Sequence, residues 1–278
     1  MATGFFKVSG SGNDFLALVE EPEPAPEAIR AWCRRGISLG ADGLFVLRRA
    51  PDGIVMDYFN ADGHPADLCL NGTRCAAQLA FHLGWAEGSM MDGIAIRTGA
   101  GTVTARRGDA ARVTLELAAP ETPRELVPEV DGIRYAGYGV RVGVPHFVLP
   151  WPESLDRAPV DTLGRQIRHH PIFPEGANVN FVRYPDGHRM EIRTFERGVE
   201  AETLSCGSGI LAAAAAGLHT GRSALPLRVS VQGGFELELL AKDTGAGPDW
   251  LLSGDARVVA QGTLLDGAAV SPPPPAWS

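Results

Sequence analysis

The feature that most constrains the fold of this 278-residue chain is a long internal repeat. In each copy a β-type run ends near a phenylalanine, and a polar loop then leads to a cysteine that opens a helical pattern. Phe59 precedes Cys69 by 10 residues, and Phe195 precedes Cys206 by 11. The repeat is too long for a solenoid unit. It predicts two homologous halves related by a pseudo-twofold axis.

The two copies also end alike. Each cysteine precedes a helix-ending glycine by 15 residues, Gly84 in the first copy and Gly221 in the second. A glycine at this point suits the left-handed C′ position that closes many helices. A glycine-interrupted hairpin sequence follows each helix, TGAGTV in one copy and QGGFEL in the other. Each half is therefore predicted to run from strand to helix to hairpin.

The remaining sequence mixes many short β-type runs with few helical patterns. The β-type runs cover residues 4–10, 43–49, 54–60, 94–107, 111–117, 140–149, 178–184, 188–196, 227–241 and 250–265, and the helical patterns cover 26–36, 74–84, 209–221 and part of 152–170. The predicted fold class is α/β (α+β) with two pseudo-symmetric domains, a number that suits the length. The predicted domains are 1–120 plus 262–278, which carries Cys69, and 121–261, which carries Cys206. The Pro-rich tail 268–278 is not expected to join a sheet.

Charge and hydropathy exclude several classes of function. The net charge is −8 and no run of basic residues exceeds two, so binding to nucleic acid or to an anionic membrane is not expected. No stretch approaches the roughly 20 apolar residues that span a bilayer. The first residues lack the pattern of a secretory signal. A cytoplasmic protein with a small zwitterionic substrate is the expectation.

The four cysteines do not form a disulfide framework, and a reducing compartment would keep them as thiols. Cys33 and Cys75 are interpreted as small buried hydrophobic residues. A structural zinc site needs four nitrogen or sulfur ligands, and the spacing from Cys69 to Cys75 is too wide for a chelate. No metal is predicted.

Cys69 and Cys206 each lie where a loop becomes a helix and are followed by small residues, in CLNG and CGSG. The N-terminus of a helix offers N–H groups without intrahelical partners and the positive end of the helix dipole. This environment is expected to lower the pKa of each thiol and to bind a carboxylate. Two such termini facing each other would hold one α-carboxylate between two thiols.

That arrangement is what an amino-acid racemase or epimerase needs. The α-proton is weakly acidic, so a base must remove it while donors stabilise the charge that develops on the carboxylate. Inversion also requires an acid on the opposite face of the α-carbon. Cys69 and Cys206 are therefore predicted to be a coupled acid–base pair.

The motifs FNADGHPADLCLNGTRC and ERGVEAETLSCGSG resemble the two signatures of the diaminopimelate epimerase family, and SGSGNDFLAL, LGADGLFVL, GVPHFV and EGANVNFV add to the likeness from about residue 5 to residue 265. The resemblance implies that each domain is a mixed sheet curled around a central helix, that the active site lies in the cleft between the domains, and that the last strand returns to the first domain. It implies a homodimer that needs no cofactor, PLP included. The reaction would interconvert LL- and meso-diaminopimelate for lysine and peptidoglycan synthesis.

The resemblance also implies roles for other residues. His146 and Glu196 would assist the thiols, and the substrate-binding residues would be Asn13, Asn60, Leu70, Asn71, Asn178, Arg197, Gly207 and Ser208. Backbone N–H groups at Leu70–Asn71 and Gly207–Ser208 would bind the reacting carboxylate, while Asn60, Asn178 and Arg197 would reach the distal end of the substrate. Judged without the resemblance, Arg197 suits a carboxylate but also fits a surface or structural arginine, the more common case. Asn60 also fits a turn, and His146 also fits a structural histidine.

Three positions depart from the family pattern. Leu70 stands where glycine is usual, His64 where serine is common, and Val144 where asparagine is common, whereas Ser208 in place of threonine is a mild change. These departures leave open a related cofactor-independent racemase that acts on another amino acid, such as histidine. A non-catalytic module that binds small ligands and a thiol hydrolase with a histidine base are further alternatives.

Overall fold

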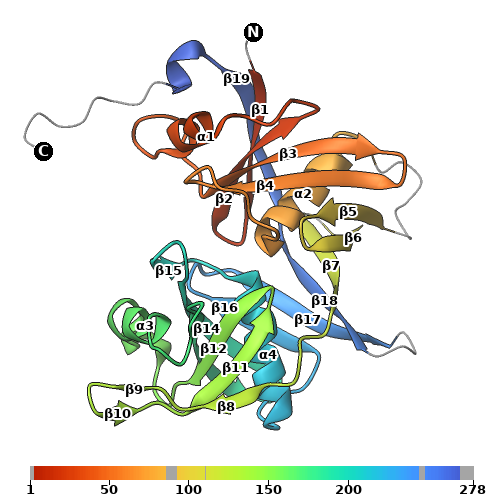
Figure 1. The fold of residues 1–278 in the computed structure, drawn as a ribbon. Helices are drawn as coiled ribbons and strands as arrows, with labels where there is room; N and C mark the ends of the chain where they lie inside the picture. Colours follow the sequence, from red (N-terminus) through yellow and green to blue (C-terminus); the bar gives the residue numbers. More distant parts are fainter. Residues whose placement is uncertain (1–2, 86–92, 110, 244–247, 270–278) are drawn as a thin grey trace, which may run out of the picture. The chain divides into compact units, whose positions relative to one another are not determined.

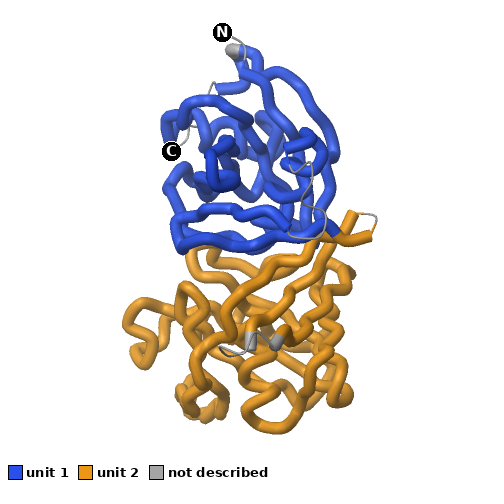
Figure 2. Tube along the Cα trace, turned by 90° about the vertical axis from the view of Figure 1, so that its right-hand side faces the viewer, with its two compact units in different colours: residues 1–107, 256–278 blue, residues 108–255 orange. Residues whose placement is uncertain are grey.

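The computed structural model describes residues 3–85, 93–109, 111–243 and 248–269 (Figure 1). The chain forms two compact units (Figure 2). Unit 1 comprises Met1–Arg107 together with Ala256–Ser278, and unit 2 comprises Gly108–Asp255. Within the described ranges, no helix is both long enough and apolar enough to cross a membrane.

Unit 1 is a single mixed sheet around one helix (Figure 1). Its strands follow the order β19 (Arg257–Leu264), β1 (Thr3–Gly10), β2 (Asn13–Val19), β3 (Gly43–Ala50), β4 (Gly53–Asn60), β5 (Ile94–Thr98) and β6 (Gly101–Arg107). The pairs β2–β3 and β4–β5 are parallel, and the other neighbours are antiparallel. Helices α1 (Pro26–Cys33) and α2 (Leu70–His82) supply the crossovers that parallel pairs require. Strands from across the sheet contact α2, so the sheet curls around it. The 3₁₀ turn η2 (Asp266–Ala269) contacts α1.

Unit 2 repeats this plan with more strands. The order is β8 (Arg124–Leu126), β11 (Gly137–Val142), β12 (Val144–Pro150), β13 (Asn178–Asp186), β14 (Arg189–Glu196), β16 (Leu227–Val231), β17 (Glu236–Asp243), β18 (Pro248–Asp255) and β7 (Arg112–Ala118). The pairs β12–β13 and β14–β16 are parallel. The crossover from β12 to β13 contains η1 (Leu155–Arg157) and α3 (Val160–Arg168), and the crossover from β14 to β16 contains α4 (Gly207–His219). The short β15 (Ala201–Thr203) pairs with β14, and β9 (Glu129–Val130) pairs with β10 (Ile133–Arg134).

The two units share one connectivity, which confirms the internal repeat and the predicted fold class. Each unit begins with an antiparallel pair of strands, and a helix then connects the second strand to a third strand parallel to it. The fourth strand is antiparallel to the third, and a second helix connects it to a fifth strand parallel to it. The fifth strand forms a hairpin with the next one. The registers agree as well. Phe59 pairs with Leu44 on β3, and Phe195 pairs with Val179 on β13. Asn60 and Glu196 therefore occupy equivalent positions, each at the end of its strand.

Small residues allow each central helix to lie inside its sheet. Ala76, Ala77 and Ala80 of α2 are fully buried, and residues 212–216 of α4 are five buried alanines. A Cβ atom at Gly217 would lie 2.4 Å from Ser223 Oγ. Since protein interiors are close-packed, larger side chains at these positions would push the helix away from the sheet.

Both central helices end as the glycine spacing predicted. Gly84 and Gly221 have positive φ angles of 71° and 66°. The N–H of Trp85 donates to the carbonyl of Ala80 at 3.0 Å, and the N–H of Arg222 donates to that of Gly217 at 2.8 Å. These bonds form a Schellman motif at each helix end. The C′ assignment of both glycines is confirmed.

Some elements were not predicted. β2 was missed because its middle is a continuous apolar run without alternation, and β8, β9, β10 and β15 are too short to show a period. α2 begins at Leu70, four residues before the predicted pattern. The pairing of β19 with β1 confirms that the last strand returns to the first part of the chain.

The predicted domain boundaries, after residues 120 and 261, remain a prediction. They differ from the unit boundaries in the placement of β7 and of the start of β19. The last residues of the Pro-rich tail, 270–278, lie outside the described residues.

Replacing Gly221 by alanine should lower the free energy of unfolding by about 1 kcal/mol, the cost of left-handed backbone for a residue with a Cβ atom. No atom lies within 4 Å of the added Cβ, so the cost is conformational. Urea denaturation measures it. Gly187→Ala is the matched control, because its Cβ also meets open space and its φ lies outside the left-handed region. Equal losses in the two variants would contradict the role of Gly221.

Candidate active site

In unit 1, Cys69 is the N-cap residue of α2. Its φ and ψ of −133° and 105° are extended, and its Sγ accepts a hydrogen bond from the N–H of Gly72 at 3.4 Å. The sulfur thus takes the place of the oxygen that usually caps a helix. The Oγ1 of Thr73 donates to the carbonyl of Cys69 at 2.9 Å, which fixes the residue further. The structure therefore places this thiol at the positive end of the helix.

Two predicted substrate-binding residues of unit 1 touch each other. Asn71 Nδ2 donates to Asn13 Oδ1 at 2.6 Å, and Asn13 Nδ2 donates to Asp42 Oδ2 at 3.0 Å. Because an ionised carboxylate only accepts, this chain of bonds fixes the orientation of both amides. Leu70, between Cys69 and Asn71, is 4% exposed, so its side chain is buried.

Arg74 was not predicted as part of this group. It is fully buried, and its Nη2 donates to Asn71 Oδ1 at 2.6 Å and to Ser11 Oγ at 2.9 Å. Ser11 has a φ of 51° and lies in the turn between β1 and β2. A cation in the second turn of α2 adds to the positive potential at the start of the helix. The sequence signal was a basic residue at the start of the predicted helical pattern, one turn after Asn71.

Asn60 lies at the same end of the sheet as Asn13. Gly43 pairs with both Phe15 and Asn60, so β2 and β3 begin where β4 ends. The N–H of Asn60 donates to the carbonyl of His64 at 2.9 Å, and its own carbonyl accepts from Gly63 at 2.9 Å. Asn60 therefore forms a turn, as its sequence context allowed, and its side chain is exposed.

In unit 2, Cys206 is the N-cap residue of α4 with nearly the same backbone angles, −124° and 106°. Its Sγ lies 3.5 Å from the Oγ of Ser208. The residue is 7% exposed. Gly207 is buried and Ser208 is partly exposed, so the predicted carboxylate-binding segment forms the first turn of the helix.

The pKa of the Cys206 thiol is raised well above its usual value, chiefly by burial and then by the negative charge of Glu196. A hydrogen bond to the Glu196 carboxylate also raises this pKa, whereas Ser208 and the N–H of Gly209 lower it. The expectation of a lowered net pKa for this thiol is therefore wrong, because desolvation and the carboxylate outweigh the lowering by the first turn of the helix. Cys206 carries its proton at neutral pH.

Glu196 is held by its own strand neighbour. The Oγ1 of Thr203 donates to Glu196 Oε1 at 2.5 Å, and Thr203 lies on β15, which pairs with the end of β14. This bond fixes the carboxylate beside Cys206. Thr203 was not identified from the sequence, because only the pairing of β15 with β14 brings it to Glu196.

His146 is 1% exposed, and burial lowers the pKa of its imidazole to about 3. The charge of Arg197 lowers this pKa further, while the hydrogen bond with Asn180 and the nearby backbone carbonyl of Val142 raise it. The ring is therefore neutral at physiological pH. In the sheet, His146 pairs with Asn178 at the start of β13.

Asn178 and Arg197 are joined through the backbone. Asn178 Oδ1 accepts from the N–H of Arg197 at 2.7 Å, and Arg197 Nη1 donates to the carbonyl of Glu175 at 3.0 Å.

In each unit the predicted site residues lie where two strands begin, a third strand ends and the central helix starts. Unit 1 gathers Asn13, Asn60, Cys69, Leu70 and Asn71, and unit 2 gathers His146, Asn178, Glu196, Arg197, Cys206, Gly207 and Ser208.

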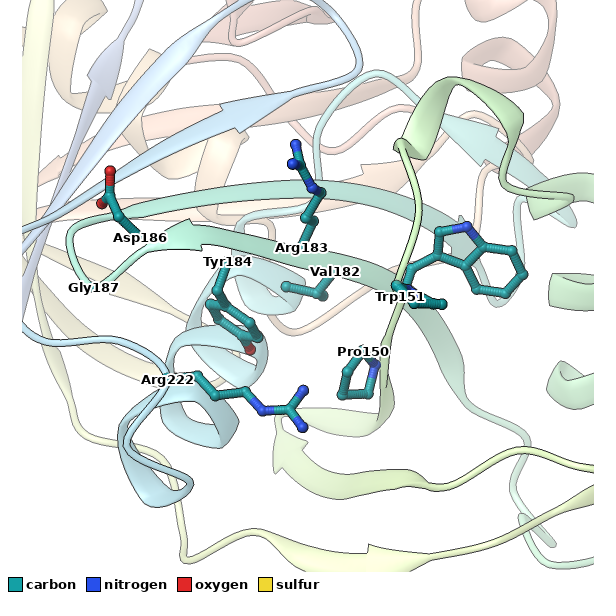
Figure 3. Close-up of a pocket in the computed structure, with 9 residues that line it drawn as sticks. Pro150, Trp151, Val182, Arg183, Tyr184, Asp186, Gly187 and Arg222 are labelled. Atoms are coloured by element: carbon teal, nitrogen blue, oxygen red, sulfur yellow. The ribbon is translucent and has the colours of Figure 1, made fainter.

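A pocket of about 460 Å³ lies elsewhere in unit 2 (Figure 3). Tyr184 of β13 lines it, and its hydroxyl donates to the carbonyl of Ala213 in the middle of α4 at 2.7 Å. Arg222, which also lines it, follows the C-terminal end of this helix. Cys206 lies at the N-terminal end of the helix, whose 13 residues span about 20 Å. None of the predicted residues lines the pocket.

In the described ranges, no group of three or more His, Cys, Asp or Glu residues is placed to hold a metal ion.

The contribution of Glu196 to the pKa of Cys206 can be measured by alkylation. In a Cys69→Ser background, Glu196→Gln should lower this pKa and speed the reaction of Cys206 with iodoacetamide at pH 8, because only the thiolate reacts. Each unit of pKa changes the thiolate fraction about tenfold. Peptide mass spectrometry measures the rate. Glu191→Gln, on the same strand but paired with Arg183, is the control and should leave the rate unchanged. A slower or equal rate in Glu196→Gln would refute the role of this carboxylate.

Sequence comparison with known proteins matches the diaminopimelate epimerase family. The sequence model described as "Diaminopimelate epimerase" matches residues 138–250. The diaminopimelate epimerase of Methanothrix thermoacetophila is 38% identical over 94% of this chain and 96% of its own length. That of Archaeoglobus fulgidus is 36% identical over 93% and 95%. Among solved structures, a probable proline racemase from Agrobacterium radiobacter K84 with bound carbonate has a TM-score of 0.72 at 16% identity, covering 95% of this chain and 93% of that one, which shows the shared fold.

Proposed function

Since the chain belongs to the diaminopimelate epimerase family, we propose that it interconverts LL- and meso-diaminopimelate without a cofactor. The observation that carries the proposal is the repeated thiol. Cys69 and Cys206 are the N-cap residues of α2 and α4, at equivalent positions in two units of the same connectivity. An epimerase needs such a pair, since one group must remove the α-proton and another must return a proton to the opposite face.

The reaction begins with the substrate α-carboxylate at the helix N-termini. The backbone N–H groups around Leu70–Asn71 and Gly207–Ser208 lie in first turns, where they have no intrahelical partners. They stabilise the negative charge that develops on the carboxylate as the α-proton leaves. The reaction requires both sulfur atoms to reach one α-carbon from opposite sides.

Cys206 is the acid in the resting enzyme, because its raised pKa keeps it protonated. Cys69, as the thiolate, then takes the α-proton, and Cys206 gives its proton to the opposite face of the carbanion. The enzyme is left with Cys69 protonated and Cys206 as the thiolate, which is the state that starts the reverse reaction. A raised pKa makes Cys206 a stronger base in that direction.

Glu196 and His146 assist from unit 2. The Glu196 carboxylate holds the proton of Cys206 through its hydrogen bond, and Thr203 holds the carboxylate. The neutral ring of His146 lies buried at the start of β12 and contributes a hydrogen-bonding group without a charge. His146 and Glu196 are thus proposed to orient substrate and thiol.

The distal amino-acid end of diaminopimelate binds Asn60, Asn178 and Arg197 in this proposal. Arg197 has further N–H donors besides the one that bonds to Glu175, and a guanidinium suits a carboxylate. Leu70 does not argue for another substrate, because its side chain is buried and it offers a ligand only its backbone.

Chiral analysis of the reduced protein with LL-diaminopimelate, without added PLP or metal, tests the substrate. Appearance of the meso isomer supports the proposal, and histidine in a parallel reaction should stay unchanged. Racemisation of histidine with no reaction of diaminopimelate would move the function to the alternative substrate. Binding of diaminopimelate with no turnover of any amino acid would favour a binding module.

We further propose from the family resemblance that the chain is a homodimer and acts in the cytoplasm. Light scattering coupled to size exclusion measures the mass in solution. A mass of twice 29.5 kDa supports the homodimer, and a mass of 29.5 kDa opposes it.

Replacing either cysteine by serine should lower the rate of epimerisation by about 10²- to 10⁴-fold, the usual contribution of a general acid or base. The reason is that a hydroxyl is a poorer general acid and base than a thiol. The comparison uses Cys69→Ser, Cys206→Ser and the wild type under one chiral assay. Cys33→Ala is the control, since Cys33 is 4% exposed in the core of unit 1 and has no role in the reaction. Wild-type rates in either serine variant would contradict the two-thiol mechanism.

A further inference from the structure

Asn180 is fully buried on β13 and was not among the predicted site residues. Its amide lies between four groups of unit 2. Nδ2 is 3.3 Å from Nδ1 of His146, 3.2 Å from the carbonyl oxygen of Phe147 and 3.5 Å from that of Asn178. Oδ1 is 3.0 Å from Oγ1 of Thr194. A buried amide with so many partners has one orientation.

The partners decide which end of the amide is the donor. The carbonyl of Phe147 only accepts, so the atom that meets it is the NH₂ group. The Thr194 hydroxyl donates to the opposite end, Oδ1. If the amide were flipped, Asn180 Oδ1 would face the carbonyl oxygen of Phe147, and both atoms only accept. A buried polar group would then lack a partner, which lowers the stability of the fold. The NH₂ group therefore also faces His146.

The orientation of Asn180 fixes the tautomer of His146. A nitrogen that faces an NH₂ group must accept, so Nδ1 carries the lone pair. The neutral imidazole has one proton, which is then on Nε2. Nε2 is buried, and no group in the described part of the chain meets hydrogen-bond geometry with it. The Val142 carbonyl, which raises the pKa of the ring, is not in hydrogen-bond geometry with Nε2. The ring thus carries a donor that a ligand can use.

The same amide is packed against the helix of the reacting thiol. A Cβ atom at Gly209 would lie 2.3 Å from Asn180 Oδ1 and 3.3 Å from Cys206 Sγ. Only glycine leaves room for both in the first turn of α4. Gly72, the equivalent residue of α2, meets the flexible end of Met56 at 3.2 Å instead. Asn180 therefore links the position of His146 to that of the Cys206 turn.

We propose that Asn180 is a positioning residue that holds His146 in the tautomer protonated on Nε2, so that its N–H donates to an anionic acceptor of the reaction, a substrate carboxylate or a thiolate. The inference rests on the proposed function. Thr194 supports the same tautomer indirectly, because its hydroxyl fixes the orientation of the Asn180 amide.

The test is the tautomer of His146, read from long-range ¹H–¹⁵N NMR spectra of the full chain labelled with ¹⁵N-histidine. The signal that disappears in His146→Gln identifies the residue among the seven histidines. The wild type should show a proton on Nε2. A proton on Nδ1 would overturn the proposal, and this outcome needs no variant of Asn180 to fold.

Asn180→Asp gives the second arm. A carboxylate at this position only accepts, so it should draw the proton to Nδ1 and lower the rate of epimerisation by about 10- to 100-fold through the misdirected ring. Thr194→Val, which frees the amide, should give a mixture of both tautomers. Retention of the Nε2 proton in both variants would also overturn the proposal.

Ser223→Ala is the matched control. Ser223 is a buried polar residue of unit 2, 7% exposed, whose hydroxyl has no partner among the described residues, so its loss should leave tautomer and rate unchanged. The tautomer is measured without substrate. A failure of this proposal is therefore distinguishable from a failure of the proposed function. In the second case, the wild type would carry the Nε2 proton but diaminopimelate would not react.

Discussion

The enclosure of a helix by its own sheet is the constraint on which each unit depends. A sheet curled closely around a helix leaves space for only small residues at many positions, which explains the buried alanines of α2 and α4. It also fixes the first turn of each helix at the edge where the neighbouring strands begin and end. Because an N-cap residue must lie at that point, the fold places one thiol in each unit at the edge where these strands begin and end.

The two units repeat a fold but do not repeat its electrostatics. The strand end that carries Asn60 in unit 1 carries Glu196 in unit 2, at the same register. A carboxylate at this position raises the pKa of the neighbouring Cys206, whereas an amide carries no charge. The difference at this strand end therefore adds to the effect of burial, which is the larger cause of the raised pKa of Cys206.

The repeat and both helix-ending glycines followed from spacing, because these features depend on local backbone geometry. The mixed α/β class followed from the pattern of β-type and helical runs, and the curling of each sheet around a helix followed from the family resemblance. The pKa of Cys206 did not, since the balance between helix and burial depends on tertiary packing around one sulfur atom. Asn180, Thr203 and Arg74 were missed for a related reason. Their partners come from other strands or from a distant turn, so only the register of the sheet brings them into contact.

The central claim is that one thiol removes the α-proton and the other returns a proton to the opposite face. The most direct measurement follows deuterium in D₂O at early times, by NMR of LL-diaminopimelate and of the meso product separated by chirality. A thiol carries one proton, so the two-thiol account predicts deuterium at the α-carbon of the product while the remaining substrate keeps its proton. Deuterium entering the remaining substrate as fast as the product would show a single base and contradict the account.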